Sequence, residues 1–137
     1  MRLDPITVEA SRFDTREVKP HFINPNCFGE DFARWLRQEV DDLGQAGYEL
    51  SDPIQEDYGW GFWATKGKDP AWISLSYCGE GPSEGPAEWV VAVEYDPGLN
   101  LIKRLFHRPD AAALSGVYGR VRDVLSSAPD IRLLEGE

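Results

Sequence analysis

Two adjacent carboxylates, Glu56 and Asp57, are the first side chains in this sequence that could carry out a reaction. A pair of acids performs acid–base work when burial or a charged neighbour raises the pKa of one member. Side chains adjacent in an extended segment point to opposite sides, and no histidine or cysteine lies near this pair in the sequence. We therefore expect a solvated pair at the entry to a strand.

A thiol nucleophile would require Cys78 to meet one of the two histidines, His21 or His107. Because a buried, inert cysteine is the usual role of this residue type, the pairing is the weaker interpretation. Two histidines far apart in sequence do not form a histidine-rich metal site. We predict neither a metal nor a cofactor.

The one basic cluster, Lys103, Arg104 and Arg108 with His107, lies just before Pro109. Proline suits the first position of a helix, and a helix N-terminus together with arginines can hold an anion. The alternative is a solvated turn, since runs of charge usually face water.

Acidic residues are concentrated in the middle of the chain. The net charge is −10, and residues 38–102 alone carry two bases and thirteen acids. Such a segment repels phosphates and attracts cations, so we predict no nucleic-acid binding and favour a cationic partner.

The chain of 137 residues has the size of one domain, which we place at residues 1–137 with a weakly specified lead-in at 1–17. No signal-peptide core and no membrane-spanning apolar run appears. Cys27 and Cys78 are far apart and outside any CxxC motif, which favours free thiols in a reducing compartment. We expect a cytoplasmic protein without membrane contact.

Apolar residues recur every three or four positions from Phe28 to Leu43, which predicts a helix that ends near Gly44 or Gly47. A second apolar stripe predicts a helix from Pro109 to the residue before Pro129. Residues 99–107 have near-helical spacing and predict a short packed turn.

Three segments with strand character, residues 59–65, 71–77 and 88–95, predict an antiparallel meander, with the Gly- and Pro-rich residues 79–86 as a hairpin loop. Weaker strand candidates lie at Ile6–Ala10, at 18–23 despite Pro20, and at 131–134.

The predicted fold class is α+β: an antiparallel meander sheet of about four to six strands with two helices packed on one face, in the order β-α-β-β-β-β-α-β. In element order this resembles the helix-grip domains and the repeat unit of the TATA-box-binding protein. That resemblance is at fold level only and implies no activity.

Alternation along the meander divides its side chains between two faces. The heavier apolar set of the meander predicts a core that packs against the apolar stripes of the two helices. The predicted core residues are Phe62, Ile73, Leu75, Val91 and Val93 in the strands and Trp35, Leu36, Val117 and Val121 in the helices. The opposite face displays two tryptophans, small residues and acids, and we take these as candidate binding residues: Trp63, Trp72, Ser74, Ser76, Glu88 and Glu94.

Three functional hypotheses follow. The leading one is a non-catalytic acidic interaction module that docks a basic protein through residues 38–102. The alternative is a domain that binds a cationic or aromatic small molecule between Trp63 and Trp72. The third is a small hydrolase-like enzyme, and a homodimer through the sheet face is a further candidate assembly.

Overall fold

A computed structural model describes residues 3–96 and 110–134 of the chain. Its strands and helices follow one another in this order: β1 (Ile6–Ala10), α1 (Glu30–Glu39), η1 (Asp41–Ala46), β2 (Glu49–Leu50), β3 (Ile54–Glu56), β4 (Gly59–Lys66), β5 (Asp69–Tyr77), β6 (Ala87–Tyr95), α3 (Ala111–Ser127) and β7 (Ile131–Leu133). The predicted α+β class is confirmed.

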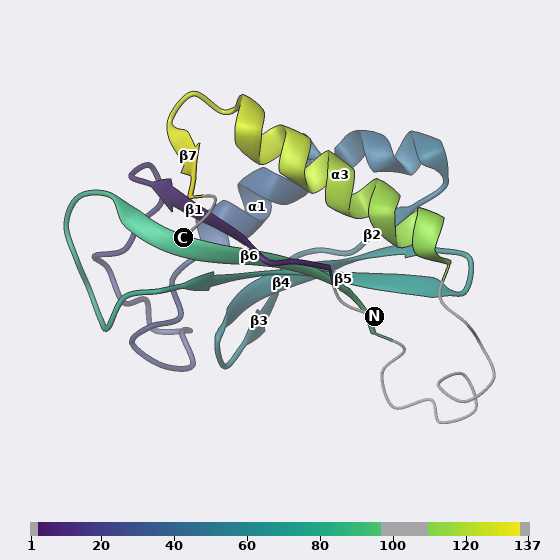
Figure 1. The fold of residues 1–137 in the computed structure, drawn as a ribbon. Helices are drawn as coiled ribbons and strands as arrows, with labels where there is room; N and C mark the ends of the chain where they lie inside the picture. Colours follow the sequence, from purple (N-terminus) through teal and green to yellow (C-terminus); the bar gives the residue numbers. More distant parts are fainter. Residues whose placement is uncertain (1–2, 97–109, 135–137) are drawn as a thin grey trace.

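The strands form one seven-stranded antiparallel sheet (Figure 1). The order is β2-β4-β5-β6-β1-β7, and β3 also pairs with β4. The meander β4-β5-β6 is the centre of the sheet, as predicted, and its two hairpins are in continuous register. The lead-in supplies β1, which lies between β6 and β7 and not at an edge.

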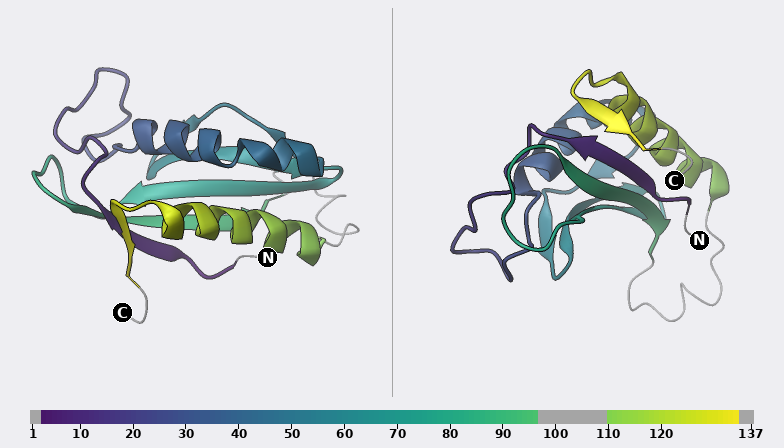
Figure 2. Two further views of the ribbon diagram at one scale, coloured as in Figure 1. Left: turned by 90° about the horizontal axis from the view of Figure 1, so that it is seen from above. Right: turned by 60° about the vertical axis from the view of Figure 1, so that its left-hand side comes forward.

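Both helices cover the same face of the sheet, and they run side by side across it (Figure 2). The stripe of α1 buries Phe32, Ala33 and Leu36. On α3 the residues with the matching spacing are buried: Leu114, Val117, Val121, Val124 and Leu125. The N-cap of α1 is Gly29, which has no side chain to cap the first turn. The apolar stripe of α1, packed on the sheet, therefore stabilises this helix.

The predicted core is confirmed, with one exception. Phe62, Ile73, Leu75, Val91, Val93, Leu36, Val117 and Val121 are all fully buried between sheet and helices. Trp35 is only half-buried: it packs on the rim of the core, where the Arg12 guanidinium lies 4.7 Å from its ring.

The predicted strand at residues 18–23 is wrong. This segment is a loop, and the side chain of Gln55 fixes it by accepting from the Ile23 N–H and donating to the His21 carbonyl. Pro20 has no N–H to give to a ladder, which favours this outcome. The first helix is also shorter than predicted, because Asp41–Ala46 tightens into a 3-10 helix before Gly47 ends it with φ of 93°.

The turn predicted at residues 99–107, Pro109 and the basic cluster of Lys103, Arg104 and Arg108 lie outside the described residues. Within residues 3–96 and 110–134, no helix has the length and apolar character needed to cross a membrane.

Candidate functional site

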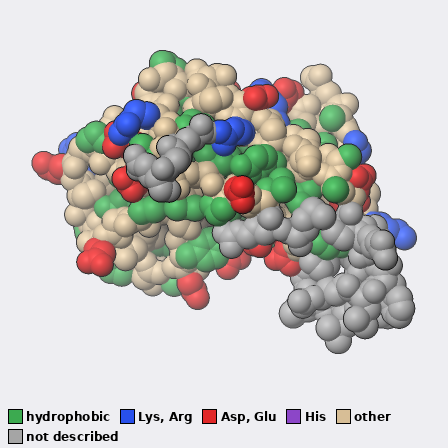
Figure 3. Space-filling model, in the orientation of Figure 1, with side chains coloured by type: hydrophobic (Ala, Val, Ile, Leu, Met, Phe, Trp, Pro, Cys, Tyr) green, Lys and Arg blue, Asp and Glu red, His purple; other side chains and the backbone are tan. Residues whose placement is uncertain are grey.

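The face of the sheet opposite the helices, here called the open face, is strongly acidic. Strand register assigns each side chain to one face, since directly paired residues point the same way. The described strands place five acids on the open face, Glu9, Glu49, Glu56, Glu88 and Glu94, against one base, Arg132. In Figure 3, acids line the lower margin, beneath the sheet, and most visible Lys and Arg side chains lie higher.

Trp72 lies on the open face as predicted, but it is not exposed. Its side chain is 5% exposed, and its ring lies over Gly61, where a Cβ atom would collide with it. Its Nε1 donates a hydrogen bond of 2.7 Å to the hydroxyl of Tyr58. The prediction of Trp72 as an open stacking wall is therefore wrong, because this ring is part of the packed structure.

A hollow of about 240 Å³ lies beside Trp72 on the open face. Its floor comes from two central strands, with two hydroxyls on β5 and two apolar side chains on β6. Glu94 and Tyr58 complete the wall. The full lining is Tyr58, Ser74, Ser76, Val90, Ala92 and Glu94.

Register explains how the strands position this lining. Ser74 pairs with Ala92, and Ser76 pairs with Val90, so each serine faces a small or apolar neighbour across the β5-β6 ladder. Glu94 lies two residues beyond Ala92 and opposite Trp72. Ser74, Ser76 and Ala92 have short side chains, which leaves room for the hollow beside Tyr58.

Tyr58 lines this hollow but was not among the binding residues predicted from the sequence. It is 47% exposed and comes from the turn between β3 and β4. Burial of the hydroxyl raises its pKa, and the Glu56 and Glu94 carboxylates raise it further, against the hydrogen bonds from Trp72 and Ser74 that lower it. The phenol therefore stays neutral at physiological pH and keeps its proton for donation.

The remaining candidates on the open face lie outside the hollow. Trp63 neighbours Trp72 across the ladder, with ring centroids 4.8 Å apart, and is half-buried. Glu88 is exposed at the opposite end of β6, where it pairs with Glu9. Of the predicted binding residues, Ser74, Ser76 and Glu94 line one cavity, and Trp72 supports it.

The acidic pair is divided by the turn. Glu56 is the last residue of β3 and pairs with Gly59 on the open face, whereas Asp57 lies in the turn, where its carbonyl accepts from the Asn24 side chain. Both are exposed. This arrangement fits the expected solvated entry to a strand.

Among the described residues, neither thiol is arranged with a histidine for nucleophilic chemistry, and His107, the other predicted partner of Cys78, lies outside them. Cys78 is exposed, so the buried cysteine favoured from the sequence is wrong; partial burial of its thiol still raises its pKa, and Glu88 raises it further, so the thiolate is disfavoured. Burial likewise raises the pKa of Cys27. Both cysteines are free, and His21 is bonded to Glu30 instead, at 2.8 Å.

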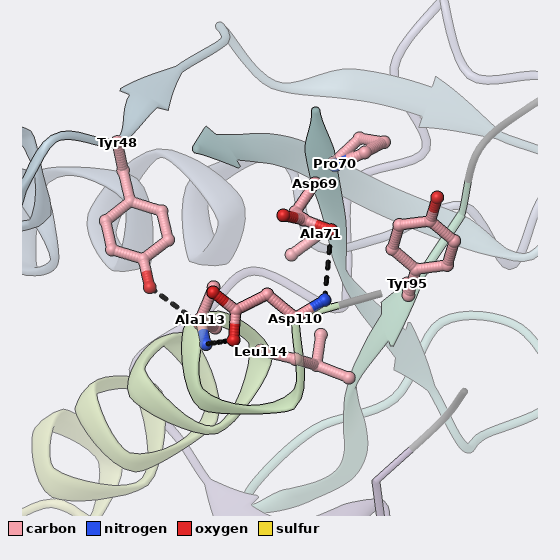
Figure 4. Close-up of a pocket in the computed structure, with 8 residues that line it drawn as sticks. All are labelled: Tyr48, Asp69, Pro70, Ala71, Tyr95, Asp110, Ala113 and Leu114. Atoms are coloured by element: carbon pink, nitrogen blue, oxygen red, sulfur yellow. Dashed lines mark hydrogen bonds between the residues drawn. The ribbon is translucent and has the colours of Figure 1, made fainter. Parts of the chain in front are cut away.

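A second cavity lies where α3 begins, between Tyr48, Asp69, Tyr95 and Asp110 (Figure 4). Its volume is about 10 Å³, enough for roughly one water molecule. The polar groups around it serve the fold: Asp110 caps α3 by accepting from the Ala112 and Ala113 N–H groups, and the Tyr48 hydroxyl donates to the Ala113 carbonyl at 2.6 Å.

A groove of about 280 Å³ separates the ends of α1 and α3. Its two cations are already paired: Arg12 binds Asp130 with two bonds of 2.6 and 2.7 Å, and Arg120 binds Asp42 at 2.9 Å. Among the described residues that line the groove, these pairs leave no unbalanced positive charge to attract an anion.

Among the described residues, no group of three or more His, Cys, Asp or Glu side chains could hold a metal ion. Comparison of the chain with protein-family models, with curated proteins and with solved structures gave no match.

Proposed function

We propose that this protein is a non-catalytic binding domain that docks a basic protein partner on the open face of its sheet. The observation that carries the proposal is the charge of this face, with five acids against one base among the described strands. That base, Arg132, lies 3.3 Å from Glu9 and offsets only that carboxylate.

Apolar exposure supports a protein as the partner. Ile54 pairs with Gly61, so it lies on the open face, and it is among the few large apolar side chains that are exposed in the described chain. Tyr58 is another, and it lies four residues further on. An apolar and aromatic centre surrounded by charge is the usual composition of a protein interface.

A second copy of the chain is a poor candidate for this surface. Two copies docked through the open face would place acids against acids, which costs free energy.

The small-molecule alternative is weakened because the Trp72 ring is not exposed as a stacking wall. The hollow of about 240 Å³ is also smaller than the pockets of about 300 Å³ and more that bind drug-sized ligands. The free thiols support a reducing compartment, and we include the cytoplasm in the proposal.

The test compares two variants of equal net charge. Glu56→Gln/Glu94→Gln neutralises two acids of the open face, and Glu39→Gln/Asp123→Asn neutralises two exposed acids on the helices. A fluorescent peptide of alternating lysine, arginine and glycine serves as the probe, with binding read by anisotropy at low and moderate salt.

We expect the peptide to bind at low salt and to weaken as salt screens the acids. The open-face variant should weaken binding by about 2- to 30-fold, from two surface pairs at roughly 0.2 to 1 kcal/mol each. The helix variant should stay within about 2-fold of the parent protein. Absence of binding at low salt, or equal losses in both variants, would overturn the proposal.

A further inference from the structure

We infer that the hollow beside Tyr58 receives the side chain of an arginine from the basic partner. This inference rests on the proposed function and adds to it a residue type and a position. The other common cationic side chain in proteins is lysine. The inference is therefore tested by comparing the binding of arginine with the binding of lysine.

The number and placement of hydrogen-bond acceptors in the hollow favour a guanidinium. Glu94 offers a carboxylate from β6, and Ser74 and Ser76 offer hydroxyls from β5. The two serines are two residues apart on one face of the strand, so their Cα atoms lie about 6 to 7 Å apart. A guanidinium carries five N–H donors in a planar fork and can reach a carboxylate and a hydroxyl together. An ammonium is a compact point charge and reaches fewer of them.

The aromatic wall of the hollow also favours arginine over lysine. Tyr58 borders the hollow with about half of its surface exposed, and its hydroxyl is fixed by the bond from Trp72. Guanidinium groups stack on aromatic rings. They are also more weakly hydrated than ammonium groups, so they lose less hydration free energy on entering a half-buried site. A ring held in place costs little conformational entropy on binding.

The floor of the hollow suits the aliphatic part of an arginine side chain. Val90 and Ala92 present apolar surface directly opposite the two serines, with Ala92 buried and Val90 half-buried, and Glu94 lies two residues beyond Ala92. The aliphatic stem of an arginine can cover such surface while its charged end reaches the carboxylate. The volume of about 240 Å³ suits one side chain and its hydration better than a whole cofactor.

The experiment uses three peptides that differ at one central position: arginine, lysine or citrulline, each flanked by glycines and two outer lysines. Citrulline keeps the shape of arginine but lacks its charge. Affinities are measured by titration calorimetry with the full chain at low salt. The variants are Glu94→Gln and Ser76→Ala, neither fully buried, with Glu39→Gln and Ser115→Ala on the helices as matched controls.

The arginine peptide should bind about 10-fold more tightly than the lysine and citrulline peptides. This preference should fall to about 2-fold or less in Glu94→Gln and in Ser76→Ala, and it should persist in both controls. A thermal melt of each variant checks that the fold is intact.

Different results separate this inference from the proposed function. If the arginine and lysine peptides bind equally, the inference fails and the basic-partner proposal stands. If no peptide binds, both fail. If the arginine preference survives in Glu94→Gln and Ser76→Ala, arginine is recognised elsewhere and the inference is overturned.

Discussion

The indole of Trp72 and the phenol of Tyr58 are joined by a hydrogen bond of 2.7 Å from Nε1 to the hydroxyl oxygen. This bond connects the centre of β5 to the turn that precedes β4, which are 14 residues apart in sequence. It fixes the aromatic wall of the hollow and gives a buried donor its acceptor.

Replacement of Tyr58 by phenylalanine should destabilise the fold although Tyr58 is half exposed. The Trp72 N–H, which belongs to a side chain that is 5% exposed, would lose this acceptor, at a cost of about 1 to 3 kcal/mol. Urea denaturation measures the loss. Tyr118→Phe, on the half-buried side of α3, serves as the control and should cost less. Equal losses in the two variants would mean that the Trp72 bond contributes nothing.

Truncation of Trp72 to alanine should cost about 3 to 5 kcal/mol, because the ring is 5% exposed and packed on Gly61. Trp35→Ala should cost less, since Trp35 is half-buried on the core rim. The sequence alone predicts the opposite ranking, with Trp35 as core and Trp72 as surface. Chemical denaturation of the two variants, measured side by side, decides between these rankings.

Two glycine-to-alanine substitutions should change the stability of the fold in opposite directions. At Gly61 a Cβ atom would lie 2.6 Å from the Ile73 carbonyl oxygen and would collide with the Trp72 ring, so Gly61→Ala should destabilise the fold and alter tryptophan fluorescence. Gly119 is inside α3 with open space around it, so Gly119→Ala should stabilise the protein by about 0.5 to 1 kcal/mol. A loss of stability at Gly119 would contradict the described position of α3.

The Tyr48 hydroxyl should make stability depend on pH in the alkaline range. Burial raises its pKa, and Asp110 and Asp69 raise it further. Because the pKa is higher in the folded state than in the unfolded state, the hydroxyl contributes to the free energy of unfolding. This contribution is complete below the unfolded-state pKa of about 10 and is lost as pH rises toward the folded-state pKa. Tyr48→Phe should therefore cost about 0.5 to 1.5 kcal/mol at pH 7, and the difference should shrink above pH 10. A constant difference across this range would mean that the Tyr48 pKa is not raised.

Regular periodicity made the central elements predictable from sequence. The α1 and α3 stripes and the alternation in β4, β5 and β6 are long enough to define a buried face, and the structure buries that face. The same alternation assigns Trp63, Trp72, Ser74, Ser76, Glu88 and Glu94 to the other face, and the strand register places them there.

Side-chain contacts that depend on tertiary structure could not be read from the sequence. The burial of Trp72 depends on Gly61 beneath it and on Tyr58 beside it, and Tyr58 belongs to a turn without periodicity. Short elements were uncertain for a similar reason. Strand β3 has three residues, too few to show a pattern. Residues 18–23 are strand-like in type, but the Gln55 side chain bonds to the backbone of this segment and holds it as a loop.

The most direct test of the open face as the binding surface is nuclear magnetic resonance of the labelled protein during titration with the arginine peptide. The amide signals that move first should belong to the hollow and its neighbours, Ser74, Ser76, Ala92 and Glu94, while those of Val117 and Leu125 in α3 stay in place. Movement confined to the groove between α1 and α3, around Trp35 and Val124, would contradict the account.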